Sequence, residues 1–406
     1  MTSRLHIAHF IHRYPPALGG SEAYFERLTE HFRSIGHKID VWTSTARTLD
    51  DFRRNATEPL PTEPGLRRYR PLTFPFRRPI LKVLSLLSPP LGSMLLQPSS
   101  PTLPVMLRDI ECYDGPLDAV HATAFPYGFP LACAYRLARR RRVPLLLTPF
   151  LHLGNPANPG DRTRKQYSSR PLVWLLKKAD AVFVQTPSEF EFAAKLGVER
   201  SKLVLQGLGV EPAECTGGDR ESVRRQWGVT DETTVVGHLA NLSVEKGTID
   251  LVAAAEDLPN CRVVLAGPEM PNFTCSRLPL SVAKLGVLSE QQKRDFFAGI
   301  DLFVLPSRTD SFGLVLLEAW ANGKPVIAYR AGGPAELVRH DVDGLLVDCG
   351  DVDGLRCAIG RMIASRELRS RLGEAGRART SGEFAWKPKL DLVAETVRRT
   401  IRTSSS

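Results

Sequence analysis

One stretch of the chain decides its fold: Pro306-Ser307-Arg308-Thr309-Asp310-Ser311-Phe312-Gly313-Leu314-Val315-Leu316-Leu317-Glu318-Ala319-Trp320. The largely apolar run from Ile300 to Leu305 before it is typical of a buried strand. Gly313 stands where a helix should begin, and the residues after it are apolar on every face, so that helix should be buried. The N–H groups at a helix start, together with the positive end of the helix dipole, bind anions. The stretch therefore predicts an anion site between two acids, Asp310 and Glu318.

These two acids suit a sugar ligand. Glu318 lies one turn into the predicted helix, where a carboxylate can accept hydrogen bonds from two vicinal hydroxyls. A phosphate with a diol at one end is what a nucleotide-sugar presents. The structural alternative is that Asp310 or Ser311 caps the helix and that Glu318 faces water.

The segment that follows repeats the pattern. Residues 323–328 read as a turn and a buried strand, and residues 331–337 open another helix with a second glycine-rich loop of the anion-binding type. Two strand–loop–helix units in succession predict a parallel sheet with a ligand at its strand ends.

These motifs together resemble a known family. Ser307-x2-Asp310-Ser-Phe-Gly-x4-Glu318-Ala, Gly-Lys-Pro-Val-Ile-Ala at 323–328 and Gly-Gly-Pro-Ala-Glu at 332–336 are similar to the signature of the family 4 retaining glycosyltransferases. That family usually has glutamate where this chain has Asp310. The resemblance covers nearly the whole chain and is most specific between Val235 and Leu346. It implies the α/β GT-B fold, in which two Rossmann-like, doubly wound parallel-sheet domains face each other across a cleft.

The length of 406 residues suits two domains, and 43% hydrophobic with 24% charged residues is typical of a soluble globular protein. The sequence has no run of about 18 uncharged apolar residues, so we expect no transmembrane helix. The N-terminus lacks the apolar segment of a signal peptide. Seven dispersed cysteines favour a reducing, cytoplasmic location.

The net charge of +10 lies in the first half: residues 1–215 have 29 Lys and Arg against 19 Asp and Glu, whereas residues 216–406 have 25 against 25. A basic face attracts phosphates of nucleic acid, anionic lipid or small molecules. The run Arg139–Arg142 raises the alternative of a nucleic-acid or membrane-binding module. It is simply explained as the solvated end of a helix, and we expect no nucleic-acid partner because no such motif accompanies it.

Alternating strands and helices predict a doubly wound sheet in each half. We expect strands at residues 5–11, 37–43, 119–121, 144–148, 181–185, 202–205, 233–239, 262–266, 282–285, 302–305, 326–328 and 345–347, and a helix at 21–35. We assign residues 1–212 to an N-terminal, acceptor-binding domain and 213–383 to a nucleotide-sugar-binding domain, with a polar linker near 211–219. Residues 384–406 resemble the final helix of the family, which packs back on the N-terminal domain.

Residues 55–116 break this rhythm. They are rich in proline and arginine and contain the apolar run from Ile80 to Leu87. We interpret them as an insertion with a short apolar helix and flexible flanks. The helix could cover the domain core, or it could be a basic and apolar element for a membrane surface or a lipid-linked acceptor.

Two further motifs resemble donor-binding elements of the family. Gly19 and Gly20, between the first strand and its helix, would let the backbone approach a phosphate; the alternative is a tight turn that needs positive φ. Residues 241–247 resemble the family's R-L-x-x-E-K-G element, whose Arg and Lys neutralise the diphosphate. Lys246 is kept, whereas Asn241 replaces the arginine, and Arg308 is a candidate to compensate for it.

The resemblance implies Asp310, Lys246 and Glu318 as catalytic residues. The implied donor-binding set is Gly19, Gly20, Asn241, Lys246, Gly267, Asp310, Ser311, Phe312, Gly313, Leu314 and Glu318. His121 and His152, at two predicted strand ends, are candidate sugar contacts or structural histidines. The family often has a second histidine where this chain has Thr123.

The implied reaction is transfer of a hexosyl unit from a UDP- or GDP-type sugar to a sugar, lipid-linked or small-molecule acceptor, with retention. The sequence has no D-x-D motif, so we expect no metal and no cofactor, with Lys246 and the helix start acting on the diphosphate. Other candidates are a storage-glucan phosphorylase or synthase and a non-catalytic relative. An anionic membrane surface is a further candidate partner, which would make a cytoplasmic protein peripheral on the inner face of the membrane.

Overall fold

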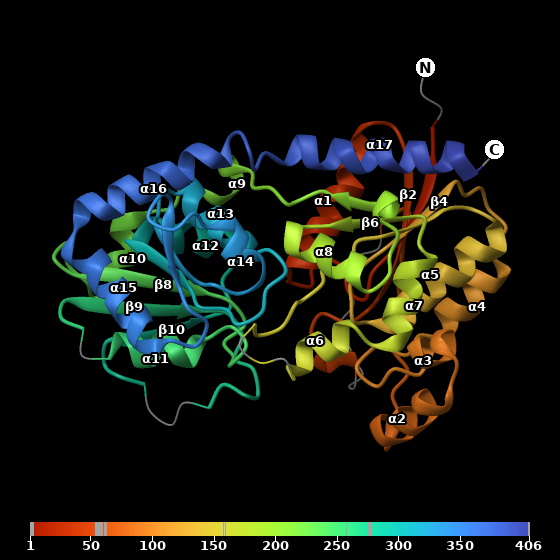
Figure 1. Ribbon diagram of the computed structural model, residues 1–406, viewed down its shortest axis with the longest axis horizontal. Coiled ribbons are helices and arrows are strands. Elements are labelled where there is room, and N and C mark those ends of the chain that lie inside the picture. Colours follow the sequence, from red (N-terminus) through yellow and green to blue (C-terminus); the bar gives the residue numbers. More distant parts are fainter. Residues whose placement is uncertain are drawn as a thin grey trace. The chain divides into compact units, whose positions relative to one another are not determined.

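The computed structural model describes residues 4–52, 60, 63–156, 158, 160–256, 258–274 and 278–404. The chain forms two compact units, each built around a parallel sheet with helices on its faces (Figure 1). The first unit comprises residues 1–151, 165–206 and 390–406, and the second comprises 152–164 and 207–389. The prediction of two doubly wound α/β sheets is confirmed.

The first sheet has seven parallel strands in the order β3-β2-β1-β4-β5-β6-β7. Its strands are β1 (His6–Phe10), β2 (Lys38–Ser44), β3 (Leu66–Tyr69), β4 (Ala119–Ala122), β5 (Leu145–Leu147), β6 (Ala181–Val184) and β7 (Leu203–Leu205). All residues of β1, β4, β5 and β6 are buried. Apolar runs without polar alternation are what a sheet covered on both faces requires.

The helices of this unit cover the sheet through apolar stripes. They are α1 (Gly20–Ser34), α2 (Arg77–Leu87), α3 (Pro90–Leu95), α4 (Pro104–Cys112), α5 (Gly128–Arg141), α7 (Arg170–Lys178) and α8 (Pro187–Lys195), with 3-10 turns at Asp50–Phe52 and Arg200–Lys202. In α1 the buried side chains Tyr24, Phe25, Leu28 and Phe32 follow the helical period. Two helices span the division between units: α6 (Arg162–Tyr167) and α17 (Trp386–Ser404).

The predicted insertion at 55–116 needs a correction. It contains β3, which extends the sheet beside β2, and α4, which packs on α5. The sequence of β3, Leu66-Arg67-Arg68-Tyr69, has no apolar run because an edge strand is only partly covered, so periodicity did not reveal it. The apolar helix was predicted correctly, as α2. Residues 55–59, 61 and 62 of the predicted flank lie outside the described residues.

The second sheet has six parallel strands in the order β10-β9-β8-β11-β12-β13. They are β8 (Thr234–Leu239), β9 (Cys261–Ala266), β10 (Val282–Gly286), β11 (Leu302–Leu305), β12 (Val326–Tyr329) and β13 (Gly344–Val347). The helices are α9 (Pro212–Cys215), α10 (Arg220–Gln226), α11 (Thr248–Ala255), α12 (Glu290–Gly299), α13 (Leu314–Ala321), α14 (Gly332–Leu337), α15 (Val352–Ala364) and α16 (Arg366–Thr380). The strand order reverses between β8 and β11, and ligands of such sheets bind where this reversal opens a crevice.

The boundaries differ from the expected ones. The chain enters the second unit after Gln206, and the polar stretch near 211–219 forms α9 within that unit. Residues 152–164 follow β5 of the first sheet but make their contacts in the second unit. No helix in the part of the chain that the structure describes is long and apolar enough to cross a membrane.

Candidate functional site

The loops that follow β8 and β11 are in direct contact at the reversal point of the second sheet. Gly247 has φ of +66°, and a Cβ at that position would lie 1.9 Å from the carbonyl oxygen of Pro306. The Arg308 N–H donates to the carbonyl oxygen of Glu245 at 2.8 Å. Glycine is therefore required at 247 both for its backbone conformation and for the close approach.

This contact brings two predicted catalytic residues together. The Nζ atom of Lys246 lies 2.6 Å from Oδ2 of Asp310, and both side chains are largely buried. Burial raises the pKa of the Asp310 carboxyl, but the Lys246 ammonium outweighs this effect and holds the pKa below its usual value. Lys246 and Asp310 thus form an ion pair in which the Asp310 carboxyl is ionised near neutral pH.

His152 lies beside this ion pair. Its Nδ1 is 3.4 Å from Oγ1 of Thr309, the residue before Asp310, and both belong to the second unit. Burial lowers the pKa of His152 to about 4, so its imidazole is neutral near pH 7. A neutral imidazole can donate to or accept from a sugar hydroxyl without competing for the diphosphate.

The second glycine loop supports the first one. Gly332 and Gly333 lie against the backbone of residues 310–312, where a Cβ on either glycine would come within 2.3 Å of main-chain atoms. The Gly333 N–H donates to the carbonyl oxygen of Asp310 at 2.9 Å. The anion-binding role expected for the second loop is therefore wrong at Gly333, because its N–H is already used to position Asp310.

Glu318 is held by a lysine that the sequence did not single out. Its helix, α13, starts after Gly313, whose φ is +95°, and no described side chain caps this start. The Glu318 Oε1 atom is 2.6 Å from Nζ of Lys293 in α12. With its side chain only 19% exposed, Glu318 does not face water. Both structural alternatives, the Asp310 or Ser311 cap and the solvated Glu318, are therefore wrong.

The two oxygens of the Glu318 carboxylate have different surroundings. Its Oε2 atom is buried and has no hydrogen-bond partner among the described residues. Burial raises the pKa of this carboxyl although Lys293 acts in the opposite direction, so desolvation is the stronger effect. A buried carboxylate oxygen without a partner is costly, and hydroxyl donors of a bound ligand would relieve that cost.

Arg308, the candidate to compensate for the arginine missing at 241, is held by an acid of the second unit. Its guanidinium is paired with Oδ2 of Asp250 at 2.5 Å, and the Tyr329 hydroxyl donates to the same oxygen at 3.0 Å. Asn241 itself is exposed, in the loop after β8. Lys246 and Arg308 are thus both held in ion pairs, with Asp310 and Asp250 respectively. Gly267, with φ of +124°, shapes the neighbouring loop, since a Cβ there would lie 1.9 Å from the Ala240 oxygen.

The loop at Gly19 and Gly20, in the first unit, already has an acid at its helix start. Gly19 is extended, so the alternative of a turn with positive φ is wrong. A Cβ on Gly19 would lie 2.3 Å from Oε2 of Glu22. Glu22 pairs with Arg13 at 2.6 Å and His12 at 3.3 Å. Burial raises the Glu22 pKa, but His12 and then Arg13 outweigh this and lower it to about 2.

His121 has the surroundings of a core histidine. It is fully buried against His9, Phe25 and Phe183, and its Nε2 is 2.8 Å from Oγ1 of Thr148. Burial lowers its pKa to about 3. Of the two alternatives for His121, the structure supports the structural one, because no surface of the residue is exposed to a sugar.

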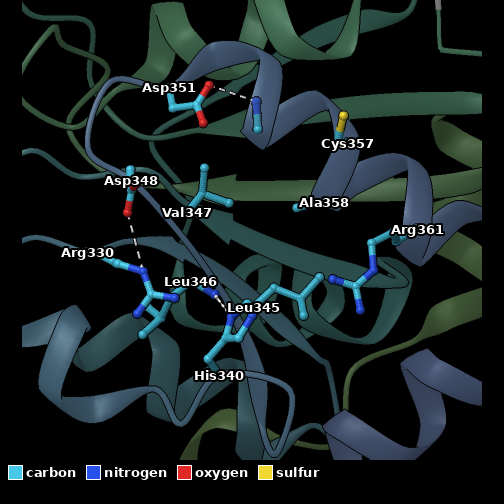
Figure 2. Close-up of a pocket in the computed structure, with 11 residues that line it drawn as sticks. Arg330, His340, Leu345, Leu346, Val347, Asp348, Asp351, Cys357, Ala358 and Arg361 are labelled. Atoms are coloured by element: carbon cyan, nitrogen blue, oxygen red, sulfur yellow. Dashed lines mark hydrogen bonds and ion pairs between the residues drawn. The ribbon is translucent and has the colours of Figure 1, made fainter.

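A separate hollow of about 300 Å³ lies on the second unit between β13 and α15, beside the residue that follows β12 (Figure 2). It is lined by Arg330, His340, Leu345, Leu346, Val347, Asp348, Asp351, Gly354, Cys357, Ala358 and Arg361. Its polar groups are engaged: Arg330 pairs with Asp348, Arg361 pairs with Asp341, and Asp351 caps α15. The hollow contains no predicted site residue. We therefore place the candidate site at Lys246, Asp310 and Glu318.

Residues that sequence reasoning missed are Lys293, Asp250 and Glu22. Lys293 pairs with Glu318, Asp250 with Arg308 and Glu22 with Arg13. None of the three lies in a recognisable motif. Within the described ranges, no group of three or more His, Cys, Asp and Glu residues is arranged to hold a metal ion.

Comparison with known proteins gives matches over most of the chain. Residues 219–379 match the family described as "Glycosyl transferases group 1", and residues 19–209 match "Glycosyl transferase 4-like domain". The lipopolysaccharide core biosynthesis glycosyltransferase LpsE of Rhizobium meliloti is 29% identical over 215 residues, which are 52% of this chain and 61% of LpsE. The chain thus spans less than two thirds of the length of this relative.

Two solved structures align with 98% of this chain and 100% of their own. Sucrose-phosphate synthase from Thermosynechococcus elongatus has a TM-score of 0.77 at 22% identity. Anabaena HepE in complex with UDP-glucose has a TM-score of 0.70 at 20% identity. At these identities the two structures bear on the fold alone.

Proposed function

Because the chain belongs to the group 1, family 4-like glycosyltransferases of the GT-B fold, as its motifs predicted, we propose that it is an active, retaining member. It would move a hexosyl unit from a nucleotide-diphosphate sugar to an acceptor hydroxyl. The observation that carries the proposal is the buried Glu318 carboxylate, whose Oε2 lacks a partner among the described residues, on the helix that follows the Lys246–Asp310 pair.

The donor would bind across the loops after β8 and β11. The N-terminus of α13 and the Lys246 ammonium would face the diphosphate, since both carry positive charge. Glu318 would accept hydrogen bonds from vicinal hydroxyls, with Lys293 fixing its other oxygen. Asp310 holds Lys246 and lies near His152. The side chains of Asp310 and His152 are therefore candidates to contact the transferred sugar.

The reaction would need no protein nucleophile. The bond between the anomeric carbon and the phosphate oxygen breaks, and its electron pair leaves with the nucleotide diphosphate. The acceptor oxygen forms the new bond on the same face, and a β-phosphate oxygen takes the acceptor's proton. Lys246 and the α13 start would stabilise the negative charge that develops on the leaving group, which is the role a preorganised cation performs best.

We propose that no metal ion takes part, because Lys246 supplies the charge that a divalent cation would otherwise give. A UDP- or GDP-type sugar is the proposed donor, and the complex of HepE with UDP-glucose makes UDP-glucose a rational first ligand. The acceptor would be a sugar, a lipid-linked group or a small molecule. We further propose a cytoplasmic protein that is peripheral on the inner face of a membrane.

A donor screen tests the proposal. Thermal unfolding would be followed with UDP-, GDP-, ADP- and TDP-sugars, and the best donor used with candidate acceptors. We expect one donor class to raise the melting temperature and the product to keep the anomeric configuration of the donor, as read by NMR. An inverted product would refute retention. Donor binding without turnover or donor hydrolysis would instead identify a non-catalytic relative.

A further inference from the structure

Helix α2 exposes a band of large apolar side chains. Phe76 is 80% exposed, Val83 58%, Leu86 77% and Leu87 82%. Ile80 and Leu84 add to the same surface, and we call these six residues the α2 patch. Figure 1 shows α2 at the periphery of the first unit, next to α3. Exposed apolar side chains gathered on one element indicate an interaction surface, whereas scattered ones do not.

The patch is one face of the helix. Phe76, Ile80, Val83 and Leu87 are spaced by four, three and four residues, which aligns them along one side of an α-helix. Arg77 and Leu81, which lie in the helical row at the edge of this face that also contains Leu84, are buried.

Arg77 orients this face outward. Its guanidinium donates to Oγ1 of Thr102 at 2.7 Å and to the carbonyl oxygen of Pro98 at 3.1 Å. The helix is thereby fixed to the segment after α3, and its apolar face is held toward solvent. The alternative that the predicted apolar helix covers the domain core is therefore wrong.

The sequence segment that contains the patch carries charge of one sign. The sequence has no Asp or Glu from residue 64 to residue 108, and the basic residues of that stretch are Arg67, Arg68, Arg70, Arg77, Arg78, Lys82 and Arg108. On α2 itself, Arg78 and Lys82 are exposed. An apolar face accompanied by exposed cations, without acids, matches an anionic lipid surface, where apolar groups enter the interface and cations meet the headgroups.

We propose that the α2 patch docks the protein on an anionic lipid bilayer. The helix lies in the plane of the interface, with Phe76, Leu86 and Leu87 inserted and with Arg78 and Lys82 at the headgroups. The eleven residues of α2 are too short to span a bilayer, so the contact is peripheral and reversible. The acid-free, basic stretch argues against a basic protein partner as the occupant.

Vesicle flotation of the full chain tests this docking. We expect binding to vesicles of phosphatidylcholine mixed with phosphatidylglycerol and much weaker binding to phosphatidylcholine alone. Arg78→Gln with Lys82→Gln should weaken binding by roughly 30-fold, because each cation near an anionic surface contributes about fivefold. Leu86→Asn with Leu87→Asn should weaken vesicle binding by about a hundredfold, because the burial of each leucine side chain contributes about tenfold.

Matched controls use residues outside the patch. Leu280→Asn removes an isolated apolar side chain that is 93% exposed in the second unit. Lys178→Gln with Lys195→Gln removes two exposed cations from α7 and α8 of the first unit. We expect both control variants to float like the unmodified chain. Arg77 is not used, because it is buried and its loss would displace the helix.

Equal binding to both vesicle types, or binding that the α2 variants leave unchanged, would overturn the proposal. So would a dimer in light scattering that the Leu86→Asn, Leu87→Asn variant converts to monomer, since the patch would then join two copies of the chain. Flotation does not depend on sugar transfer, so failure here would leave the proposed donor chemistry intact.

Discussion

Removal of the Glu318 carboxylate should abolish tight donor binding. Its Oε2 atom is buried without a partner among the described residues, and Oε1 is held at 2.6 Å by Lys293. Two hydrogen bonds from ligand hydroxyls to a charged carboxylate contribute about 1.5–3 kcal/mol each, so Glu318→Ala should raise the donor Kd by roughly 10²- to 10⁴-fold. Isothermal titration calorimetry with the donor identified in the screen measures this change.

The same carboxylate predicts how binding depends on pH. Burial raises the pKa of Glu318, and only the ionised form accepts from both hydroxyls. Donor affinity should therefore weaken as the pH falls through this raised pKa, at a higher pH than for an ordinary carboxyl. For stability the sign is opposite: the contribution of a carboxyl with a raised folded-state pKa is lost as the pH rises through that pKa.

A double variant separates binding from folding. Glu318→Gln with Lys293→Met removes both buried charges, and such a replacement is often neutral for stability. We expect its free energy of unfolding to stay close to that of the unmodified chain while donor binding remains weak. Glu367→Gln, at an exposed acid in the first turn of α16, serves as control. Unchanged donor affinity in Glu318→Ala would refute the assignment of the hydroxyl contact.

Three further changes test the rest of the site. Lys246→Ala should lower kcat by about 10²- to 10³-fold, because the leaving group loses its stabilising charge. Single-turnover assays measure this change, and an unchanged circular dichroism spectrum shows that the variant is folded. Normal turnover would mean that another group carries this role. Gly247→Ala should lower the melting temperature. A positive φ alone costs about 1–2 kcal/mol for alanine, and the new Cβ would meet the Pro306 carbonyl oxygen. An unchanged melting temperature would contradict the contact between the loops. EDTA should leave the transfer rate unchanged, and an activity lost in EDTA and restored by magnesium would disprove metal independence.

The sequence predicted the buried strands inside each sheet better than it predicted the strand at the sheet edge. Buried parallel strands such as Ala181–Val184 and Leu302–Leu305 are apolar throughout, because both faces of the sheet are covered, and this composition is visible without a structure. Leu66–Tyr69 is only partly covered and has two adjacent arginines at its centre, so its sequence shows no apolar run that would predict a strand. The surroundings of α2 were likewise not predictable, because exposure depends on what the neighbouring elements leave uncovered.

The sequence by itself determined the two parallel sheets and the helix start at Gly313. It also determined the candidate site residues, which are the base Lys246 and the acids Asp310 and Glu318. These are local properties: apolar runs, a glycine and short motifs. Only the tertiary structure decided which charges pair. It joined Lys246 to Asp310 across 64 positions and Glu318 to Lys293 across 25, and it committed Arg308 to Asp250. Pairing is decided by distance and burial after folding, and neither quantity is written in a stretch of neighbouring residues.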